Sequence, residues 1–391
     1  MNVSLVLWLI PTVVVAGGIA LVVAIAKLAN NLRERRRGIR SAQYIAAIGE
    51  LVSRRSLPKH PPRGWADDLL FCDALAEYRL SIMGADRGHV DALVDHIGIR
   101  DALWNRIRKT RSSIRRLRTV ALWVDLAGPA DTPRLVELLD DRDQYVAIHA
   151  AKGLSRIGSV ESVDEILDRM VHADPWHAAR LADSLVDYNV RIGPAIRVWI
   201  GDRLCADMPP TQSIALAIRI LGVIGDHRAE SMLMALVDHE DPDIRIATAS
   251  ALGRVGSDRC VDALVVATKD EVWPVRARAA ASLGRLGAER ALDALQYLLE
   301  DREWWVRQNA AQAIGAIPGG RPVLIDALDG TDPYAADAAL HQLTTSGAIE
   351  EAERRIEAGV AVGRDEALVA HVRRIGFGGW RASLHTVPTV A

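Results

Sequence analysis

Residues 241–287 read DPDIRIATASALGRVGSDRCVDALVVATKDEVWPVRARAAASLGRLG, and this stretch contains one pattern twice. Leu252-Gly253 and Leu283-Gly284 stand 31 residues apart, and Leu221-Gly222 and Ile314-Gly315 extend the same step in both directions. Three further pairs keep this period: Ile244-Arg245, Val275-Arg276 and Val306-Arg307. A fixed period of this length predicts a helical-repeat solenoid, in which each unit contacts only its neighbours.

Each repeat is expected to hold two helices, A and B. After Asp241, the apolar residues Ile244, Ala247, Ala251 and Val255 recur at helical spacing and predict the buried face of helix A. Gly225, Gly256 and Gly287 stand where a helix end favours a left-handed residue. Helix B follows, with apolar positions in two successive repeats at Val261, Leu264 and Val265, then Leu292, Leu295 and Leu298.

The frame extends beyond these repeats. It places Trp123, Leu154 and Leu185 upstream and Leu343 downstream, with one longer step between Leu185 and Leu221. The array then has about eight units. The insertion, residues 192–212, includes a Pro-rich stretch that predicts a loop, and residues 365–376 predict a final capping unit.

The consensus, an acidic residue followed by Val-Arg, Ala-Ala, Leu-Gly-x-Leu-Gly and a second helix with Leu-x-x-Leu, resembles the short HEAT-like repeat of phycobilin lyases. The resemblance covers roughly residues 119–376. It implies an all-α solenoid. Relatives with such repeats include lyases, metal-dependent hydroxylases and adaptors, so the resemblance leaves the activity open.

The N-terminal stretch from Val3 to Ala26 contains no charged side chain and predicts a transmembrane helix. A cleaved signal peptide is the alternative, but positive charge follows the apolar run instead of preceding it. The expected topology is a single-pass protein of the inner or plasma membrane, with the N-terminus outside and the repeats cytoplasmic. Ala16, Ala20 and Ala24 form a small-residue face that could pack against another membrane helix, although ordinary membrane-helix composition also explains it.

Charge is unevenly distributed in a chain of net charge −2. Residues 27–63 carry ten basic and two acidic side chains, whereas residues 119–391 carry 28 basic and 40 acidic ones. The basic segment is expected to contact anionic lipid headgroups. The predicted contact residues are Lys27, Arg33, Arg35, Arg36, Arg37 and Arg40. Nucleic-acid binding is the alternative, and the acidity of the repeats argues against it.

These features divide the chain into five predicted parts: a transmembrane anchor (1–28), a basic juxtamembrane helix with a Pro-rich linker (29–63), an atypical helical cap (64–118), the HEAT-like solenoid (119–376) and a flexible tail (377–391). The three cysteines, Cys72, Cys205 and Cys260, are scattered, as expected in a reducing compartment.

Catalytic patterns are absent from the sequence. A dinuclear hydroxylase centre would need several His-Glu pairs, and only His239-Glu240 occurs. His172, Asp174 and His177 lie at a repeat junction and predict a surface loop more than a metal site. We therefore expect neither an enzyme nor a cofactor or metal, with lyase activity as the alternative that fold resemblance suggests.

Aromatic residues give the positive signal for binding. Ten Trp and two Phe are present, and several aromatic residues lie at or next to the start of helix A. Rigid aromatic side chains often dominate protein interfaces, but they could equally seal the junctions between repeats. The predicted partner-binding residues are Tyr145, Trp176, Trp273, Trp304, Trp305 and Tyr334.

The recurrent arginines Arg245, Arg276 and Arg307 could grip an anion, but pairing with Asp or Glu of the same or the next repeat is the favoured prediction. Taken together, the sequence predicts a membrane-anchored cytoplasmic scaffold that binds a membrane-associated protein. The resemblance to bacterial membrane-anchored HEAT proteins implies a membrane glycosyltransferase complex for surface polysaccharide as that partner.

Overall fold

The computed structural model describes residues 3–55, 57–58, 64–66, 68–206, 209–362 and 364–375, without the side chains of residues 3–25, 29, 33 and 375. Every regular element in these ranges is helical. The chain divides into two compact units, Met1–Ile157 and Gly158–Ala391, and each is described by itself.

Unit 1 begins with a long helix and continues with shorter ones. Its elements are α1 (Val3–Ser53), α2 (Leu69–Ser81), α3 (Ala85–Ile97), α4 (Ile99–Lys109), α5 (Ser113–Leu126), the 3-10 turn η1 (Pro129–Asp131), α6 (Thr132–Leu139) and α7 (Gln144–Ile157). Helix α3 begins directly after Gly84, which makes the turn after α2 with φ of 68°.

Unit 2 is a regular array of helical hairpins. Its α-helices are α8 (Val163–Val171), α9 (Pro175–Val186), α10 (Gly193–Leu204), α11 (Thr211–Ile224), α12 (Glu230–Ala235), α13 (Pro242–Val255), α14 (Cys260–Ala267), α15 (Trp273–Leu286), α16 (Leu292–Leu298), α17 (Trp304–Ala316), α18 (Gly320–Leu328), α19 (Pro333–Thr345), α20 (Ala348–Glu357) and α21 (Asp365–Ile375). Its 3-10 turns are η2 (Val160–Ser162), η3 (Asn189–Ile192), η4 (His227–Ala229) and η5 (Glu289–Ala291).

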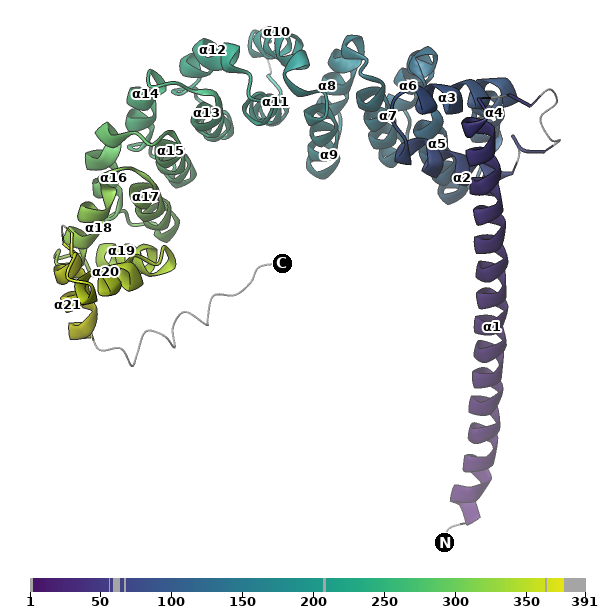
Figure 1. Cartoon of the computed structure of the whole chain (residues 1–391), viewed down its shortest axis with the longest axis horizontal. Helices are drawn as coiled ribbons and strands as arrows, with labels where there is room; N and C mark the ends of the chain where they lie inside the picture. Colours follow the sequence, from purple (N-terminus) through teal and green to yellow (C-terminus); the bar gives the residue numbers. More distant parts are fainter. Residues whose placement is uncertain are drawn as a thin grey trace. The chain divides into compact units, whose positions relative to one another are not determined.

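Figure 1 shows that the helices of unit 2 form two layers. Helices α11, α13, α15, α17 and α19 follow one another on the inner side of its curve, and α10, α12, α14, α16 and α18 lie on the outer side. The inner layer contains the predicted A helices. The apolar residues predicted for the buried face of helix A, which are Ile244, Ala247, Ala251 and Val255, are at most 2% exposed. The sequence period thus predicts the hairpins and their buried faces correctly.

The glycine of each Leu-Gly pair is required by close packing within the inner layer. A Cβ on Gly284 would lie 2.6 Å from the Cα of Ala313 on α17, and a Cβ on Gly222 would lie 2.9 Å from the Cα of Ala251 on α13. On Gly253 it would meet Ser282 at 2.4 Å. Neighbouring A helices therefore approach backbone to backbone, which explains why the dipeptide recurs.

The helix ends follow the prediction at two of three glycines. Gly225 and Gly287 adopt left-handed conformations with φ of 71° and 65°. Gly256 differs, with φ of −71° and ψ of 154°. The N–H of Gly256 still donates to the carbonyl of Leu252, and Cys260 packs closely against Gly256. Helix α13 therefore ends here without a left-handed residue.

The insertion between Leu185 and Leu221 contributes helix α10, and Pro209 and Pro210 of the predicted Pro-rich loop lie between α10 and α11, while residues 207–208 lie outside the described residues. Helix α10 occupies residues 193–204 as the outer helix of its repeat, and Trp199 on it donates to Asp168 of α8 at 2.7 Å. The longer step in the sequence comes from the greater length of this outer helix.

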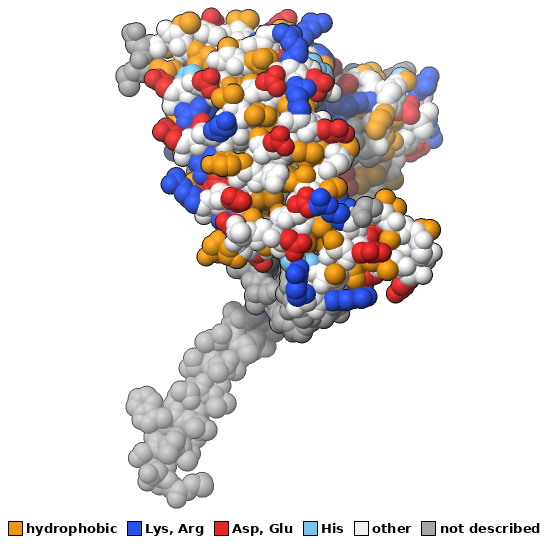
Figure 2. All heavy atoms as spheres, turned by 90° about the vertical axis from the view of Figure 1, so that its left-hand side faces the viewer, with side chains coloured by type: hydrophobic (Ala, Val, Ile, Leu, Met, Phe, Trp, Pro, Cys, Tyr) orange, Lys and Arg blue, Asp and Glu red, His pale blue; other side chains and the backbone are white. Residues whose placement is uncertain are grey.

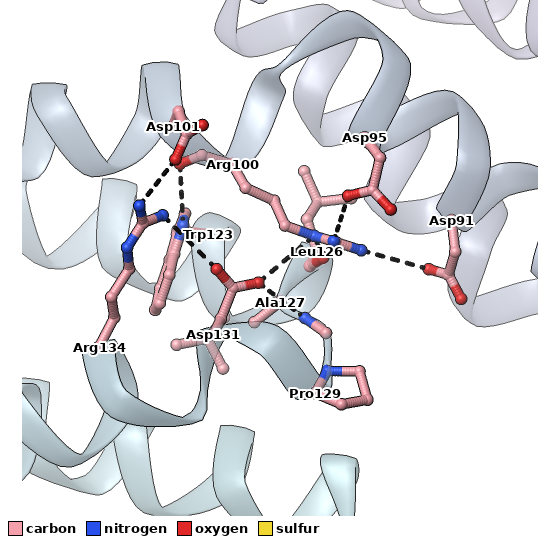
Figure 3. Close-up of polar contacts among 12 residues, drawn as sticks. Asp91, Asp95, Arg100, Asp101, Trp123, Leu126, Ala127, Pro129, Asp131 and Arg134 are labelled. Carbon is pink, nitrogen blue, oxygen red and sulfur yellow. Dashed lines mark hydrogen bonds and ion pairs between the residues drawn. The ribbon is translucent and has the colours of Figure 1, made fainter.

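In unit 1, two arginines with little exposure link the helices to one another. Arg100 on α4 donates to the Leu126 carbonyl at 2.8 Å and lies among the carboxylates of Asp91, Asp95 and Asp131 (Figure 3). Arg79 on α2, 5% exposed, pairs with Asp91 at 2.6 Å. These bonds link α2, α3, α4 and the turn after α5.

The predicted membrane localisation is wrong. Within the described residues, no helix has a stretch long and apolar enough to cross a membrane, which contradicts the single-pass topology. A hydrocarbon core needs about 20 apolar residues, and the described side chains of α1 include a dense basic run after Lys27. Ala16, Ala20, Ala24 and Arg33, to which we assigned membrane roles, lie outside the described side chains.

The basic residues of α1 partly serve its packing on α2. Arg37 pairs with Asp73 at 3.1 Å, and Arg40 pairs with Asp68 at 2.8 Å. Lys27, Arg35 and Arg36 are exposed. Lipid contact by this segment is unsupported, because two of its charges are compensated within the unit.

Replacing Gly284 by alanine should lower the free energy of unfolding by about 2 kcal/mol, because the methyl group meets the backbone of α17. Gly201 is the matched control, since the space around it is open, and its change to alanine should stabilise α10 by up to about 1 kcal/mol. Urea titration followed by circular dichroism measures both. Equal effects of the two variants would refute the close-packing role of Gly284.

Candidate functional site

The arginine ladder predicted from the repeat, Arg245, Arg276 and Arg307, is buried at the junctions between repeats. Each of the three side chains is less than a tenth exposed. A buried charge needs partners, because its desolvation costs several kcal/mol. The partners therefore decide whether the ladder serves structure or ligand binding.

Arg276 on α15 is fully engaged with the protein. It forms a bidentate pair with Asp301, with Nε–Oδ2 at 2.7 Å and Nη2–Oδ1 at 2.9 Å, and its Nη1 donates to the carbonyls of Asp270 and Glu271. Asp301 belongs to the next repeat. We call this arrangement the Arg-Asp clasp, since it joins the start of one A helix to the start of the next.

The clasp recurs at other junctions. Arg245 bonds Asp270 at 2.8 and 3.1 Å and donates to the carbonyls of His239 and Glu240. In unit 1, Arg116 on α5 pairs bidentately with Asp141 over the same sequence separation of 25 residues. Arg116 precedes Trp123 by the same seven residues by which Arg245 precedes Leu252, so it occupies the ladder position of its repeat.

Arg307 uses a different partner. Its Nη1 donates to the carbonyls of Asp301 and Arg302, and its guanidinium lies 5.0 Å from the ring centre of Tyr334. Asp332, at the position that would complete a clasp, accepts the N–H groups of Tyr334 and Ala335 and caps α19. The cation–π contact thus fixes an exposed aromatic ring to the ladder.

The clasp changes the acidity of its carboxylates. Burial alone would raise the pKa of Asp301, but the hydrogen bonds from Arg276 and from the Glu303 N–H together hold this pKa below its ordinary value. The pKa of Asp141 is lowered in the same way, by Arg116 and the Asp143 N–H. Both carboxylates are therefore ionised and structural at neutral pH.

Three consecutive A helices of unit 2 begin with exposed aromatic residues. Trp273, Trp304, Trp305 and Tyr334 are 39%, 48%, 58% and 65% exposed, and we call them the aromatic edge. Trp304 and Trp305 pack edge to face, with ring centres 4.6 Å apart, and the Trp305 carbonyl accepts from Asn309. These rings are held in place without being buried.

The other two predicted aromatic residues are also exposed, Tyr145 by 50% in unit 1 and Trp176 by 54% at the start of α9. Both follow a capping aspartate: Asp143 accepts from the Tyr145 N–H and Asp174 from the Trp176 N–H. In unit 2, α11 and α13 begin without an aromatic residue and separate Trp176 from the aromatic edge.

The side chains considered as possible metal ligands or reactive groups make contacts within their own helices and turns. Asp174 caps α9 and its Oδ2 lies 2.5 Å from Nδ1 of His177. In the part of the chain that the structure describes, no three His, Cys, Asp or Glu side chains converge as metal ligands. Cys260 is buried, and burial raises the pKa of its thiol.

The comparisons agree with the repeat architecture. A family model described as HEAT repeats matches residues 204–281 and 261–344. The two matches together span residues 204–344. The match includes α11 to α19 and therefore contains two Arg-Asp clasps and the aromatic edge of the HEAT array. No curated protein matches the sequence.

Solved structures show the same fold at low identity. The karyopherin Kap121p bound to the SUMO protease Ulp1p has a TM-score of 0.55 at 12% identity, covering 80% of this chain and 38% of that one. Kap121p bound to the extreme C-terminus of the protein phosphatase Cdc14p has a TM-score of 0.54 at 11% identity, with coverage of 80% and 40%. This chain spans about two fifths of the karyopherin's length, and the likeness concerns the fold alone.

Arg276→Ala should lower the free energy of unfolding by about 3 kcal/mol, because it leaves Asp301 buried without its charged partner. Arg278 is the matched control on the same helix, since it is exposed, and its change to alanine should cost less than about 0.5 kcal/mol. Urea denaturation of the full chain compares them. Similar losses in the two variants would contradict the clasp.

The clasp should also give a pH-dependent stability. A carboxylate with a lowered folded-state pKa contributes stability above its ordinary pKa of about 4, and this contribution is lost as the pH falls through the folded-state value. Asp301→Asn should therefore be less stable than the wild type at pH 7, and the difference should shrink below pH about 4. A difference that is constant or grows on acidification, measured by urea titration, would argue against an ionised Asp301.

Proposed function

We propose that this protein is a non-enzymatic scaffold that binds a protein partner through the aromatic edge of its HEAT array. The observation that carries the proposal is the exposure of four aromatic side chains on three consecutive A helices. Large aromatic rings in water lose little conformational entropy on binding and are enriched among residues that dominate interface energies.

The edge is pre-organised for such a role. The Arg307 guanidinium makes a cation–π contact with the Tyr334 ring. Hydrogen bonds to backbone carbonyls fix the position of that guanidinium. Trp304 and Trp305 support one another edge to face. A partner would therefore meet rings that are already positioned, which reduces the ordering cost of association.

The outer layer differs from the edge. Figure 2 shows acidic and basic side chains interspersed with small hydrophobic areas over the visible face of the array. A mixed surface of this kind is typical of solvated protein, so the aromatic edge stands out as the binding surface.

Other classes fit the observations less well. Nucleic acid would be repelled by the acidic residues that outnumber basic ones after residue 118. Lyase activity would need a placed acid and base, and the described residues of the edge include neither around a closed pocket. The glycosyltransferase partner implied by resemblance is supported by no contact described above, and it is not part of the proposal.

The test is a quantitative pull-down with the full chain, in which the double variant Trp304→Ala and Trp305→Ala should lose most of a stoichiometric partner that the wild type retains. Loss of two interface tryptophans typically costs several kcal/mol of binding. The control is Tyr297→Ala, which removes an exposed aromatic residue from the outer helix α16.

Circular dichroism must show equal folding of both variants. Retention of the same partner by the tryptophan variant, or its equal loss from the Tyr297 variant, would refute binding through the aromatic edge.

A further inference from the structure

The inner layer of the HEAT array contains a hollow away from the aromatic edge. It has a volume of about 490 Å³ and is lined by residues of α9, α11, α13 and α15. Its walls combine small and aliphatic side chains, such as Leu216, Ile246 and Ala247, with arginines. A concave surface of this size and mixed character can hold more than a single ion.

Arginines concentrate around the hollow. Arg219 lies on α11, Arg254 on α13 and Arg278 on α15, and all three line it. Arg285 follows two turns after Arg278 on α15, and all four side chains are exposed. The Cδ of Arg254 lies 3.5 Å from the position that a Cβ on Gly222 would take, so this side chain leans from α13 onto α11. We call these four residues the arginine cluster.

The cluster differs from the ladder in its partners. Arg245 and Arg276 each have a bidentate aspartate, whereas none of the four cluster arginines forms an ion pair with an acidic side chain of the described residues. Among the described residues that line the hollow, Asp243 is the one with an acidic side chain. The positive charge of the cluster is therefore largely uncompensated.

Repulsion within the cluster also affects the pKa of one of its members. Burial lowers the pKa of the Arg285 guanidinium from its ordinary value, and the positive charges of Arg254 and Arg278 lower it further. Like charges held close together oppose folding, so they add no stability of their own. A bound anion would relieve this repulsion.

The surroundings restrict the class of anion. The cluster spans three helices, which exceeds the reach of one small ion, while Asp243 and the acidic remainder of the array disfavour a long polyanion. No aromatic ring lines the hollow for stacking a base. Carboxylates alternating with aliphatic side chains match both the guanidinium groups and the apolar wall.

We propose that the hollow between α11, α13 and α15 binds an acidic peptide segment of a protein partner, with Arg219, Arg254, Arg278 and Arg285 pairing with its carboxylates. This site is separate from the aromatic edge. It would give the scaffold a second, charge-selective contact, which favours a particular partner and raises its association rate.

The test uses fluorescence anisotropy of a short fluorescein-labelled peptide of alternating glutamate and leucine, added to the full chain. The wild type should bind it, and Arg254→Gln plus Arg278→Gln should weaken binding by at least about tenfold, since hydrogen bonds to charged groups contribute about 1.5–3 kcal/mol each. The matched control is Arg228→Gln plus Arg259→Gln, which removes the same charge from the turns between A and B helices.

A peptide with glutamine in place of glutamate should not bind, and sodium chloride should weaken binding of the glutamate peptide. The proposal is overturned if the wild type does not bind the peptide, if both double variants weaken binding equally, or if inorganic phosphate or single-stranded DNA binds the cluster in place of the peptide. Trp304→Ala plus Trp305→Ala should leave peptide binding unchanged. The proposal for the hollow and the proposal for the aromatic edge are therefore tested independently.

Discussion

A guanidinium taken out of water at a repeat junction must be paired, and the Arg-Asp clasp is how the array meets this constraint. Asp301 accepts Arg276 with its carboxylate and Arg307 with its backbone carbonyl, so one residue ties two repeats together. The adjacent Leu-Gly pair lets the A helices approach until the Gly284 and Ala313 backbones nearly touch. The clasp and the close approach of the A helices together determine how successive repeats stack. The positions of the aromatic edge and the arginine cluster depend on that stacking.

The same stacking leaves two kinds of side chain available. At the start of the A helices, where the clasp has satisfied the local charge, Trp304, Trp305 and Tyr334 remain exposed. Along the inner layer, the arginine cluster lies exposed without carboxylate partners. Arginine thus has two roles in one array: at the ladder position it holds the repeats together, and in the arginine cluster it has no carboxylate partner among the described residues and is proposed to meet a ligand. Burial and the presence of an aspartate 25 residues later separate the two roles.

Much of the fold could be predicted from the sequence, because the Leu-Gly and Val-Arg pairs recur with a constant step wherever packing repeats. Helix α10 was not predicted, because it lies within the insertion that departs from the 31-residue step. The arginine cluster had only a partial periodic signal: Arg254 and Arg285 keep the 31-residue step, whereas Arg219 and Arg278 occupy other positions of the repeat and join them only in space. Hydropathy alone predicted a membrane anchor, and the described helices contain no such span. Exposure of the aromatic edge could not be derived from spacing, because a ring at a junction can face either way.

The most direct test of this account is a double-mutant cycle on Arg276 and Asp301, with each changed to alanine singly and together and the free energy of unfolding measured by urea titration. The clasp predicts a coupling energy above about 1.5 kcal/mol, because each single change leaves the other charge buried and unpaired. A coupling energy below about 0.5 kcal/mol would show that the two residues act independently, and it would contradict the claim that this pair holds the repeats together.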